Sequence, residues 1–231
     1  MDGQNVKKIK RKNVEFCGLN IAQMAKIELL MDETQGNNAL VDWVIGEIDK
    51  LNMGENILTI EETNQLNSFG NAQRKKEFNA VRHLKHQVFG EELIIYGENG
   101  KPKLNKSDRT IGISHSAHWA LFAHSRIPFG CDIEEISDRI ISISDRFCSS
   151  DELKLFAGEV GAMQLTQLWS CKEALYKLIN AKGINWKKQM RCMAISGTKF
   201  TFAVETGTED FIVNCDSVLV KNVILSIATY A

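Results

Sequence analysis

Residues 167–177 read Gln-Leu-Trp-Ser-Cys-Lys-Glu-Ala-Leu-Tyr-Lys, and the interpretation of the whole chain starts from this stretch. On a wheel with ~100° per residue, segment 165–179 forms an amphipathic helix. Its apolar face consists of Leu165, Leu168, Trp169, Leu175, Tyr176 and Ile179. Lys172 falls in the middle of that face, and Glu173 and Lys177 project together from its flank, spaced i,i+4. A lysine in this position needs an anion to pair with or a wet cleft to point into. The alternative is a core helix with a snorkelling lysine and a surface ion pair.

The chain is long and hydrophobic enough to form a buried core. The chain has 231 residues, of which 44% are hydrophobic, enough for one large domain or two small ones. No run approaches the ~18 apolar residues needed to span a bilayer, and no apolar block follows the basic residues of segment 7–12. The net charge of -1 gives no overall attraction to nucleic acid. We therefore expect a cytoplasmic protein that binds neither membranes nor nucleic acid.

The six cysteines show no C-x-x-C spacing and no clustering with the five histidines. Zinc binding and a disulfide framework are both disfavoured by this pattern. The cysteines are interpreted as small buried hydrophobic residues in a reducing compartment. The lysine-rich start is interpreted as a solvated tail, and we assign no function to residues 1–38.

Several cations in the first half are candidates for binding an anion. Segment 60–90 has a helical pattern, and within it Lys75 and Arg82 are seven residues apart, so they lie on nearly the same side, ~10 Å from each other. Such a pair would hold the two ends of one anionic ligand; a solvated basic face is the alternative. Lys101 follows a Gly-Glu-Asn-Gly turn and precedes a proline that restricts its backbone.

A strand with polar donors at its end is predicted at 110–116. The strand finishes with Ser114, His115 and Ser116, and a second strand follows at 119–124. Two hydroxyls and an imidazole form a plausible set of hydrogen-bond donors to a phosphate. The alternative for His115 is a purely structural hydrogen bond.

The run 129–133 is strand-like and is followed directly by Glu134. Period-two geometry places Asp132 and Glu134 on one face of this strand, a few ångströms apart. Two carboxylates that close repel each other unless a proton or cation lies between them, and hard oxygen ligands suit Mg²⁺. Surface strands also carry Asp-x-Glu by chance, so the motif alone is weak.

The remaining segments complete an α+β fold. Ser149 to Glu152 resembles a capping box, and the helix that contains Lys172 is expected to run to Ala181, stopped by Gly183. A β-hairpin follows at 190–204, and then two further strands at 211–215 and 218–229. We expect two successive halves of comparable size, 1–126 and 127–231, each an antiparallel sheet packed on a long helix.

Four motifs in this order resemble the signature set of the 4'-phosphopantetheinyl transferases, of the larger, surfactin-synthetase-activating type. They are Gly100-Lys101-Pro102, Ser114-His115-Ser116, Gly130-Cys131-Asp132-Ile133-Glu134 and the stretch from Trp169 to Lys177. The resemblance covers roughly 74–182. It implies a monomer of two similar halves related by pseudo-two-fold symmetry, with coenzyme A bound between them. It also implies an enzyme of the holo-[acyl-carrier-protein] synthase type, which moves the 4'-phosphopantetheine arm of coenzyme A to a serine hydroxyl of a carrier protein.

The resemblance assigns roles in the chemistry to five residues. Asp132, Glu134 and Glu173 match the family's ligands of Mg²⁺, for which Mn²⁺ is an alternative. Glu173 also matches its proposed base on the carrier serine. Lys172 and Lys177 match the lysines near the pyrophosphate.

The coenzyme contacts are assigned in the same way. Ser114, His115 and Lys101 match phosphate contacts, and Arg82 matches an arginine at the nucleotide end. Lys75 rests on helical spacing alone, because the family's cations upstream of Arg82 do not align onto this chain.

Two other functions stay open. A Mg²⁺-dependent phosphohydrolase would use the same carboxylates with water as nucleophile. A non-catalytic module would bind coenzyme A or a carrier without chemistry. The carrier's pathway, whether fatty-acid, polyketide or nonribosomal peptide synthesis, is not encoded in these motifs.

Overall fold

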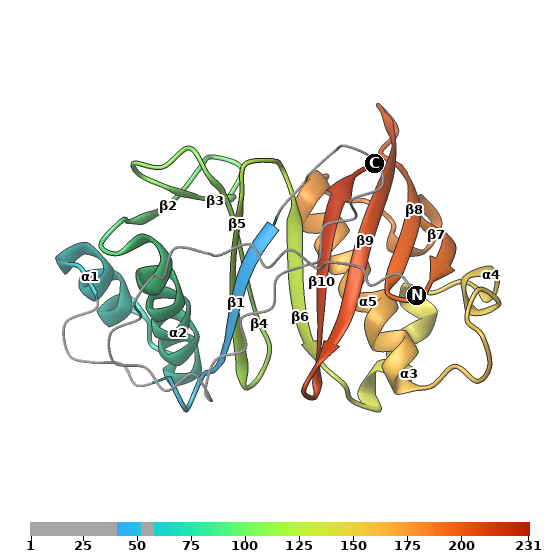
Figure 1. Cartoon of the computed structure of the whole chain (residues 1–231), viewed down its shortest axis with the longest axis horizontal. Coiled ribbons are helices and arrows are strands. Elements are labelled where there is room, and N and C mark those ends of the chain that lie inside the picture. Colours follow the sequence, from blue (N-terminus) through green and yellow to red (C-terminus); the bar gives the residue numbers. More distant parts are fainter. Residues whose placement is uncertain (1–40, 52–57) are drawn as a thin grey trace, which may run out of the picture.

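The computed structural model describes residues 41–51 and 58–231, so the lysine-rich start and the rest of 1–38 lie outside the described residues. Figure 1 shows two sheets as neighbouring units, each accompanied by its long helix. The predicted α+β class is confirmed. No helix in the described ranges is long and apolar enough to cross a membrane.

The first sheet has five antiparallel strands in the order β1-β5-β4-β3-β2. Its strands are β1 (Val41–Glu47), β2 (Ile94–Tyr96), β3 (Pro102–Leu104), β4 (Thr110–His115) and β5 (Trp119–Ser125). Two helices lie between β1 and β2 in the chain: α1 (Ile60–Ser68) and α2 (Ala72–Phe89).

The second sheet has the order β6-β10-β9-β8-β7. In both sheets the last strand pairs with the first, and the others follow in reverse chain order. The strands are β6 (Gly130–Glu135), β7 (Met190–Ser196), β8 (Lys199–Glu205), β9 (Asp210–Val220) and β10 (Val223–Tyr230). The helical segments are α3 (Arg139–Ile143), the 3₁₀ turn η2 (Ser144–Arg146), α4 (Ser150–Leu153), α5 (Ala162–Ile179) and α6 (Trp186–Gln189).

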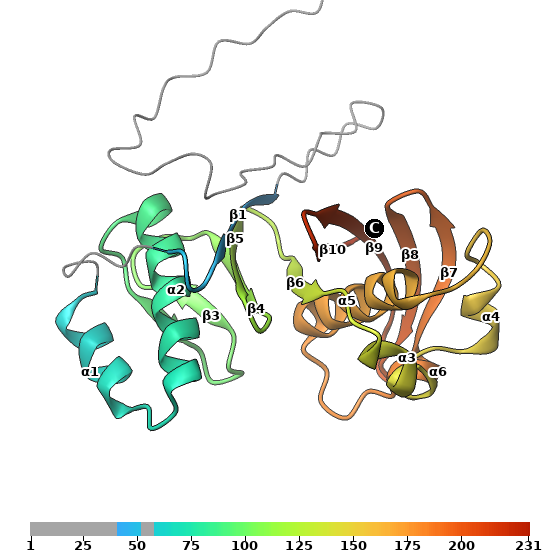
Figure 2. The same cartoon turned by 90° about the horizontal axis from the view of Figure 1, so that it is seen from below.

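Helix α2 is defined by its ends and by its buried side. The side chain of Asn71 accepts a hydrogen bond from the backbone N–H of Arg74 at 3.0 Å, and Gly90 ends the helix with a φ of +58°. Buried apolar residues such as Val81 and Leu84 pack against the first sheet. Figure 2 shows α2 on the side of this sheet that faces away from the second sheet.

Helix α5 lies across the second sheet and touches β6, β9 and β10. Its contact with β6 is very close at Gly130, where an added Cβ would lie 2.0 Å from the carbonyl oxygen of Ala174. Only glycine permits this approach. The helix ends earlier than expected: Asn180, at φ +56°, donates its N–H to the Tyr176 oxygen at 2.8 Å, so the predicted end at Ala181 was wrong.

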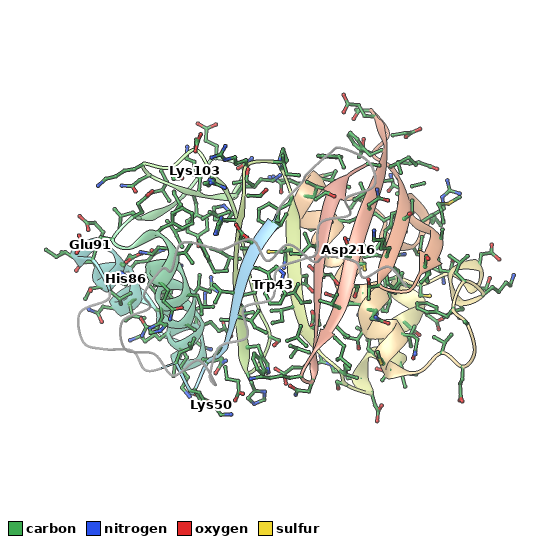
Figure 3. All side chains as sticks on the ribbon, viewed as in Figure 1. Trp43, Lys50, His86, Glu91, Lys103 and Asp216 are labelled. Carbon is green, nitrogen blue, oxygen red and sulfur yellow. The ribbon has the colours of Figure 1, made fainter. Side chains whose placement is uncertain are left out.

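A hydrophobic cluster joins the two sheets. It contains Trp43 and Leu121 from the first sheet and Ile133 and Leu225 from the second. Figure 3 labels Trp43 at this junction. A Cβ at Gly112 would lie 2.5 Å from the sulfur of Cys131, which shows how closely β4 approaches β6. The junction therefore brings the end of β4 beside the carboxylates of β6.

Candidate active site

A cleft of about 400 Å³ is lined by residues from both sheets and both long helices. Its lining includes Arg74, Glu77, Arg82, Ser114 and His115 from the first half and Asp132, Glu134, Glu173 and Lys177 from the second. The cleft thus gathers all but three of the residues expected at the site. The exceptions, within the described part of the chain, are Lys75, Lys101 and Lys172.

Asp132 is held by one residue from each wall. Lys177 Nζ donates to Asp132 Oδ1 at 2.7 Å and to Ser114 Oγ at 2.9 Å, and the Ser114 hydroxyl donates to the same Oδ1 at 2.9 Å. Burial is the largest single effect and lowers the pKa of Lys177, but Asp132, Cys131 and Glu173 together outweigh it, so the pKa is raised. Lys177 is therefore a permanent cation in contact with Asp132.

Glu134 and Glu173, the other two carboxylates that the second half contributes to the cleft, have no such ammonium partner among the described residues. Burial, and then repulsion from Asp132, raises the pKa of Glu134 to about 7 and that of Glu173 to about 7. Glu134 Oε1 accepts a hydrogen bond from the indole Nε1–H of Trp169, a residue of α5, at 2.9 Å. The charged forms of both glutamates are costly here unless a further cation enters the cleft.

A divalent cation fits this arrangement, although the described residues contain no ready group of three His, Cys, Asp or Glu side chains that would hold one. Asp132 Oδ2 is buried and has no hydrogen-bond partner among the described residues. Such an oxygen is costly when left unpaired and is available as a ligand. Mg²⁺ is usually bound by one or two carboxylates together with substrate phosphates and waters, so a complete protein cage is not required.

His115 and Arg74 form the polar part of the opposite wall. An Arg74 guanidinium nitrogen lies 3.1 Å from His115 Nε2, and Glu77 lies 3.5 Å from the same atom. Burial lowers the pKa of His115. Arg74 was not expected, but the lining residues of α2 from Arg74 to Arg82 recur at helical spacing, and that pattern could have identified it. Lys75 is not one of the lining residues in the described part of the chain, although it lies only ~20° round the helix from Arg82.

Arg82 lies in the wall but is strongly buried. Its guanidinium carbon is 3.8 Å from the centre of the Phe78 ring, and its Nε is 3.7 Å from Glu62. Within the described ranges, Nε and Nη2 have no hydrogen-bond partner. Arg82 therefore has two buried donor nitrogens whose hydrogen bonds are not satisfied by the described residues.

Lys101 and Lys172 are both engaged elsewhere. Lys101 Nζ donates to the carbonyl oxygen of Leu178 at 2.8 Å, close to the end of α5, so it links the β2–β3 turn to that helix. Burial lowers its pKa. Its neighbours Gly100 and Pro102 line the cleft.

Lys172 does occupy the apolar face of its helix, but its counter-ion is internal. The side chain is 0% exposed, and Nζ lies 2.7 Å from Glu152 Oε1. It also donates to the carbonyl oxygens of Phe147, at 2.6 Å, and Trp186, at 3.1 Å. Glu152 is the capping-box residue of α4, and it accepts from the Ser149 N–H at 2.8 Å. The anion that this lysine requires is therefore Glu152, and the expected contact with a pyrophosphate does not follow from its position.

Comparison with known proteins is consistent with these motifs. The sequence model of the 4'-phosphopantetheinyl transferase superfamily matches residues 128–228. The chain is 35% identical over 114 residues to "4'-phosphopantetheinyl transferase psf-1" of Bacillus pumilus, covering 46% of this chain and 48% of that protein. It is 27% identical over 144 residues to "4'-phosphopantetheinyl transferase ffp" of Bacillus subtilis, covering 52% and 64%.

A third relative is "4'-phosphopantetheinyl transferase gsp" of Aneurinibacillus migulanus, 34% identical over 93 residues and covering 38% of this chain and 39% of that protein. The chain thus spans about half the length of the curated relatives it matches. The superfamily match includes β6, which carries Asp132 and Glu134, and α5, which carries Glu173 and Lys177. Over residues 128–228 the chain is therefore similar to the 4'-phosphopantetheinyl transferase superfamily.

Proposed function

We propose that this protein transfers the 4'-phosphopantetheine arm of coenzyme A to a serine hydroxyl of an apo acyl or peptidyl carrier protein. The products would be the holo-carrier and adenosine 3',5'-bisphosphate. The observation that supports this most is the cleft itself. One wall of the cleft carries Asp132, Glu134, Glu173 and Lys177, and the opposite wall carries groups that can donate hydrogen bonds to a phosphate. The first of these walls lies within the segment that matches the superfamily.

The second half would carry the chemistry. Asp132, Glu134 and Glu173 are the carboxylates that would hold Mg²⁺ or Mn²⁺, whose charge would screen the oxygens of the transferred phosphate. Lys177 would stabilise negative charge that develops on the pyrophosphate. Glu173, whose pKa is raised to about 7 by burial and by Asp132, is suited to accept a proton near neutral pH.

The proposed reaction is a nucleophilic substitution at phosphorus. The serine oxygen of the carrier forms a bond to the phosphorus that bears the pantetheine arm, and Glu173 takes the hydroxyl proton. The bond from this phosphorus to the bridging oxygen of the pyrophosphate breaks, and that oxygen leaves with the adenosine 3',5'-bisphosphate. The protein's part is to position the two substrates and neutralise charge, as in other phosphoryl transfers.

The first half would bind the coenzyme. Ser114 and His115 are the proposed phosphate contacts, and Arg82 is the proposed contact at the nucleotide end. Arg74 replaces Lys75 in this proposal, because it lines the cleft and contacts His115. Lys101 would act by holding the turn beside the cleft.

We leave Lys172 out of the proposed catalytic set, because its ammonium group is fully buried against Glu152. The halves 1–126 and 127–231 are proposed to be related by pseudo-two-fold symmetry, which the identical strand order of the two sheets supports. A monomer in a reducing, cytoplasmic setting is also part of the proposal; the five described cysteines are unpaired and buried.

Intact-mass spectrometry tests the function. Several apo-carriers from fatty-acid, polyketide and nonribosomal peptide synthesis are incubated with the protein, coenzyme A and Mg²⁺. A transferase adds one phosphopantetheine to at least one carrier and needs that carrier to consume the coenzyme. Consumption of coenzyme A without any carrier would support the phosphohydrolase instead, and binding without turnover would support the non-catalytic module.

A further inference from the structure

The turn between β4 and β5 is tied to the opposite sheet by one carboxylate. Glu135, the last residue of β6, accepts three hydrogen bonds from this turn. Its Oε1 accepts from the Ser116 hydroxyl at 3.0 Å and from the backbone N–H of His118 at 2.8 Å. Its Oε2 lies 2.9 Å from His118 Nδ1. Hydrogen bonds to a carboxylate are stronger than those between neutral groups, so this is a firm link between the two halves.

The first half holds the same turn from its other side. Gln73 Nε2 donates to the carbonyl oxygen of Ala117 at 3.1 Å, and the Ile48 N–H donates to the carbonyl oxygen of His118 at 2.8 Å. Gln73 is adjacent to Arg74, which contacts His115 in the cleft. The turn is therefore fixed by α2, by the residue after β1 and by the end of β6.

The position of this link relates it to the cleft. Ser114 and His115, which line the cleft, immediately precede the turn. Glu135 immediately follows Glu134, yet it is not one of the cleft-lining residues in the described part of the chain. Any effect of Glu135 on the cleft would therefore pass through the turn and not through contact with a ligand.

We propose that Glu135 is a positioning residue: by holding the turn 116–118, it fixes Ser114 and His115 at the correct distance from the carboxylates of β6. The inference rests on the proposed function, because it assumes that Ser114 and His115 bind the coenzyme. Both residues are proposed to contact phosphates of the bound coenzyme before the reaction, so a misplaced wall should weaken coenzyme binding more than it slows the chemical step.

The test compares Glu135→Ala, Glu135→Gln and the control Glu205→Ala in the full chain. Glu205 pairs with Arg191 at the surface of the second sheet, outside the described lining of the cleft, so its loss removes an ion pair remote from the site. Calorimetry gives the Kd of coenzyme A, and transfer to a carrier gives KM and kcat. Thermal midpoints show the temperature range in which each variant is fully folded.

Glu135→Ala is expected to raise both Kd and KM for coenzyme A about 10-fold, comparable with the low end of the range for removing a partner that orients a metal ligand. The value of kcat should change by less than about 2-fold. Glu135→Gln should retain most of the affinity, because an amide oxygen still accepts from Ser116 and His118. The control should bind like the wild type. If Glu135→Ala does not fold, the double variant Ser116→Ala/His118→Ala removes two of the three donors and should also weaken binding.

A lower thermal midpoint with unchanged Kd and KM in the folded range would overturn the inference, because Glu135 would then be a structural link only. A wild type that binds coenzyme A but modifies no carrier would overturn the proposed function and leave the binding comparison valid. Equal weakening by Glu135→Ala and Glu205→Ala would also overturn the inference, since it would show a general loss of stability.

Discussion

Asp132 is where the two walls of the cleft meet, and its two oxygens have different surroundings. Oδ1 accepts from both Lys177 and Ser114, whereas Oδ2 is buried without a partner among the described residues. One oxygen therefore holds the walls together, and the other is available to a cation. A buried carboxylate tolerates this only if its charge is compensated, and Lys177 supplies part of that compensation.

Replacing Asp132 should abolish most of the proposed transfer. Asp132→Asn keeps the shape of the side chain but loses the charge, so we expect kcat/KM to fall by roughly 10² or more, the scale of losing one preorganised charged group. Mn²⁺ binding, followed by electron paramagnetic resonance, should weaken in parallel. Asp138→Ala is the control, because the Asp138 side chain makes no capping hydrogen bond to α3. Transfer by Asp132→Asn at the wild-type rate would contradict the metal assignment.

The site was predictable where it depends on local geometry. Strand periodicity placed Asp132 and Glu134 on one face, and both line the cleft. It was not predictable where a side chain has a choice of partner. The sequence cannot show that Lys172 meets Glu152, 20 positions earlier in the chain, because that contact depends on how α4 packs against α5.

At the level of elements, periodicity and caps predicted most of the helices and strands. The capping box at Ser149 is present, and the hairpin predicted at 190–204 forms β7 and β8. The last two strands were divided in the wrong place: β9 continues to Val220, and the turn lies at Lys221, which adopts a φ of +57°. No glycine or proline marks this turn, and a lysine in the left-handed region is not expected from composition.

The buried pair of Lys172 and Glu152 should be important for stability. Lys172→Met leaves the Glu152 carboxylate without its cation, and breaking one side of a buried pair costs about 3–5 kcal/mol. The free energy of unfolding in urea should fall by this amount, with coenzyme binding little changed in the folded protein. The double variant Lys172→Met/Glu152→Gln should recover part of the loss. If Lys172→Met were as stable as the wild type but inactive, Lys172 would have to be assigned a direct role in the chemistry.

Helix α2 should make stability depend on pH. His83 is buried, neither ring nitrogen has a partner among the described residues, and burial lowers its pKa below 6.5. Below pH 6.5 the unfolded chain therefore binds a proton that the folded protein binds only at lower pH. The contribution of the neutral His83 to the free energy of unfolding is complete above pH 6.5. It decreases as the pH drops below this value, by up to about 1.4 kcal/mol per pH unit. In urea unfolding between pH 7 and pH 5, His83→Leu should lose less stability than the wild type. An identical slope in the two proteins would show that His83 is not responsible.

The whole molecule is built as a helix, a sheet, a second sheet and a second helix, with a hydrophobic cluster at each contact. One cluster lies between α2 and the first sheet, one between the sheets, and one between α5 and the second sheet. The middle cluster contains residues of β1, β5, β6 and β10. The cleft is formed by residues of both halves, so its shape depends on this middle cluster staying intact.

Because the two sheets share this cluster, we expect them to unfold as one unit. Ile133 is 0% exposed in the middle cluster, and Ile133→Ala should lower the free energy of unfolding by about 2–5 kcal/mol, the range for truncating a buried isoleucine. Ile212→Ala, at a position that is 52% exposed on β9, should change it by less than about 0.5 kcal/mol. Urea unfolding followed by both tryptophan fluorescence and far-ultraviolet circular dichroism should give one coincident transition that shifts as a whole in Ile133→Ala. Two separate transitions, only one of which moves, would mean that each half is stable alone and that the cleft can open without unfolding.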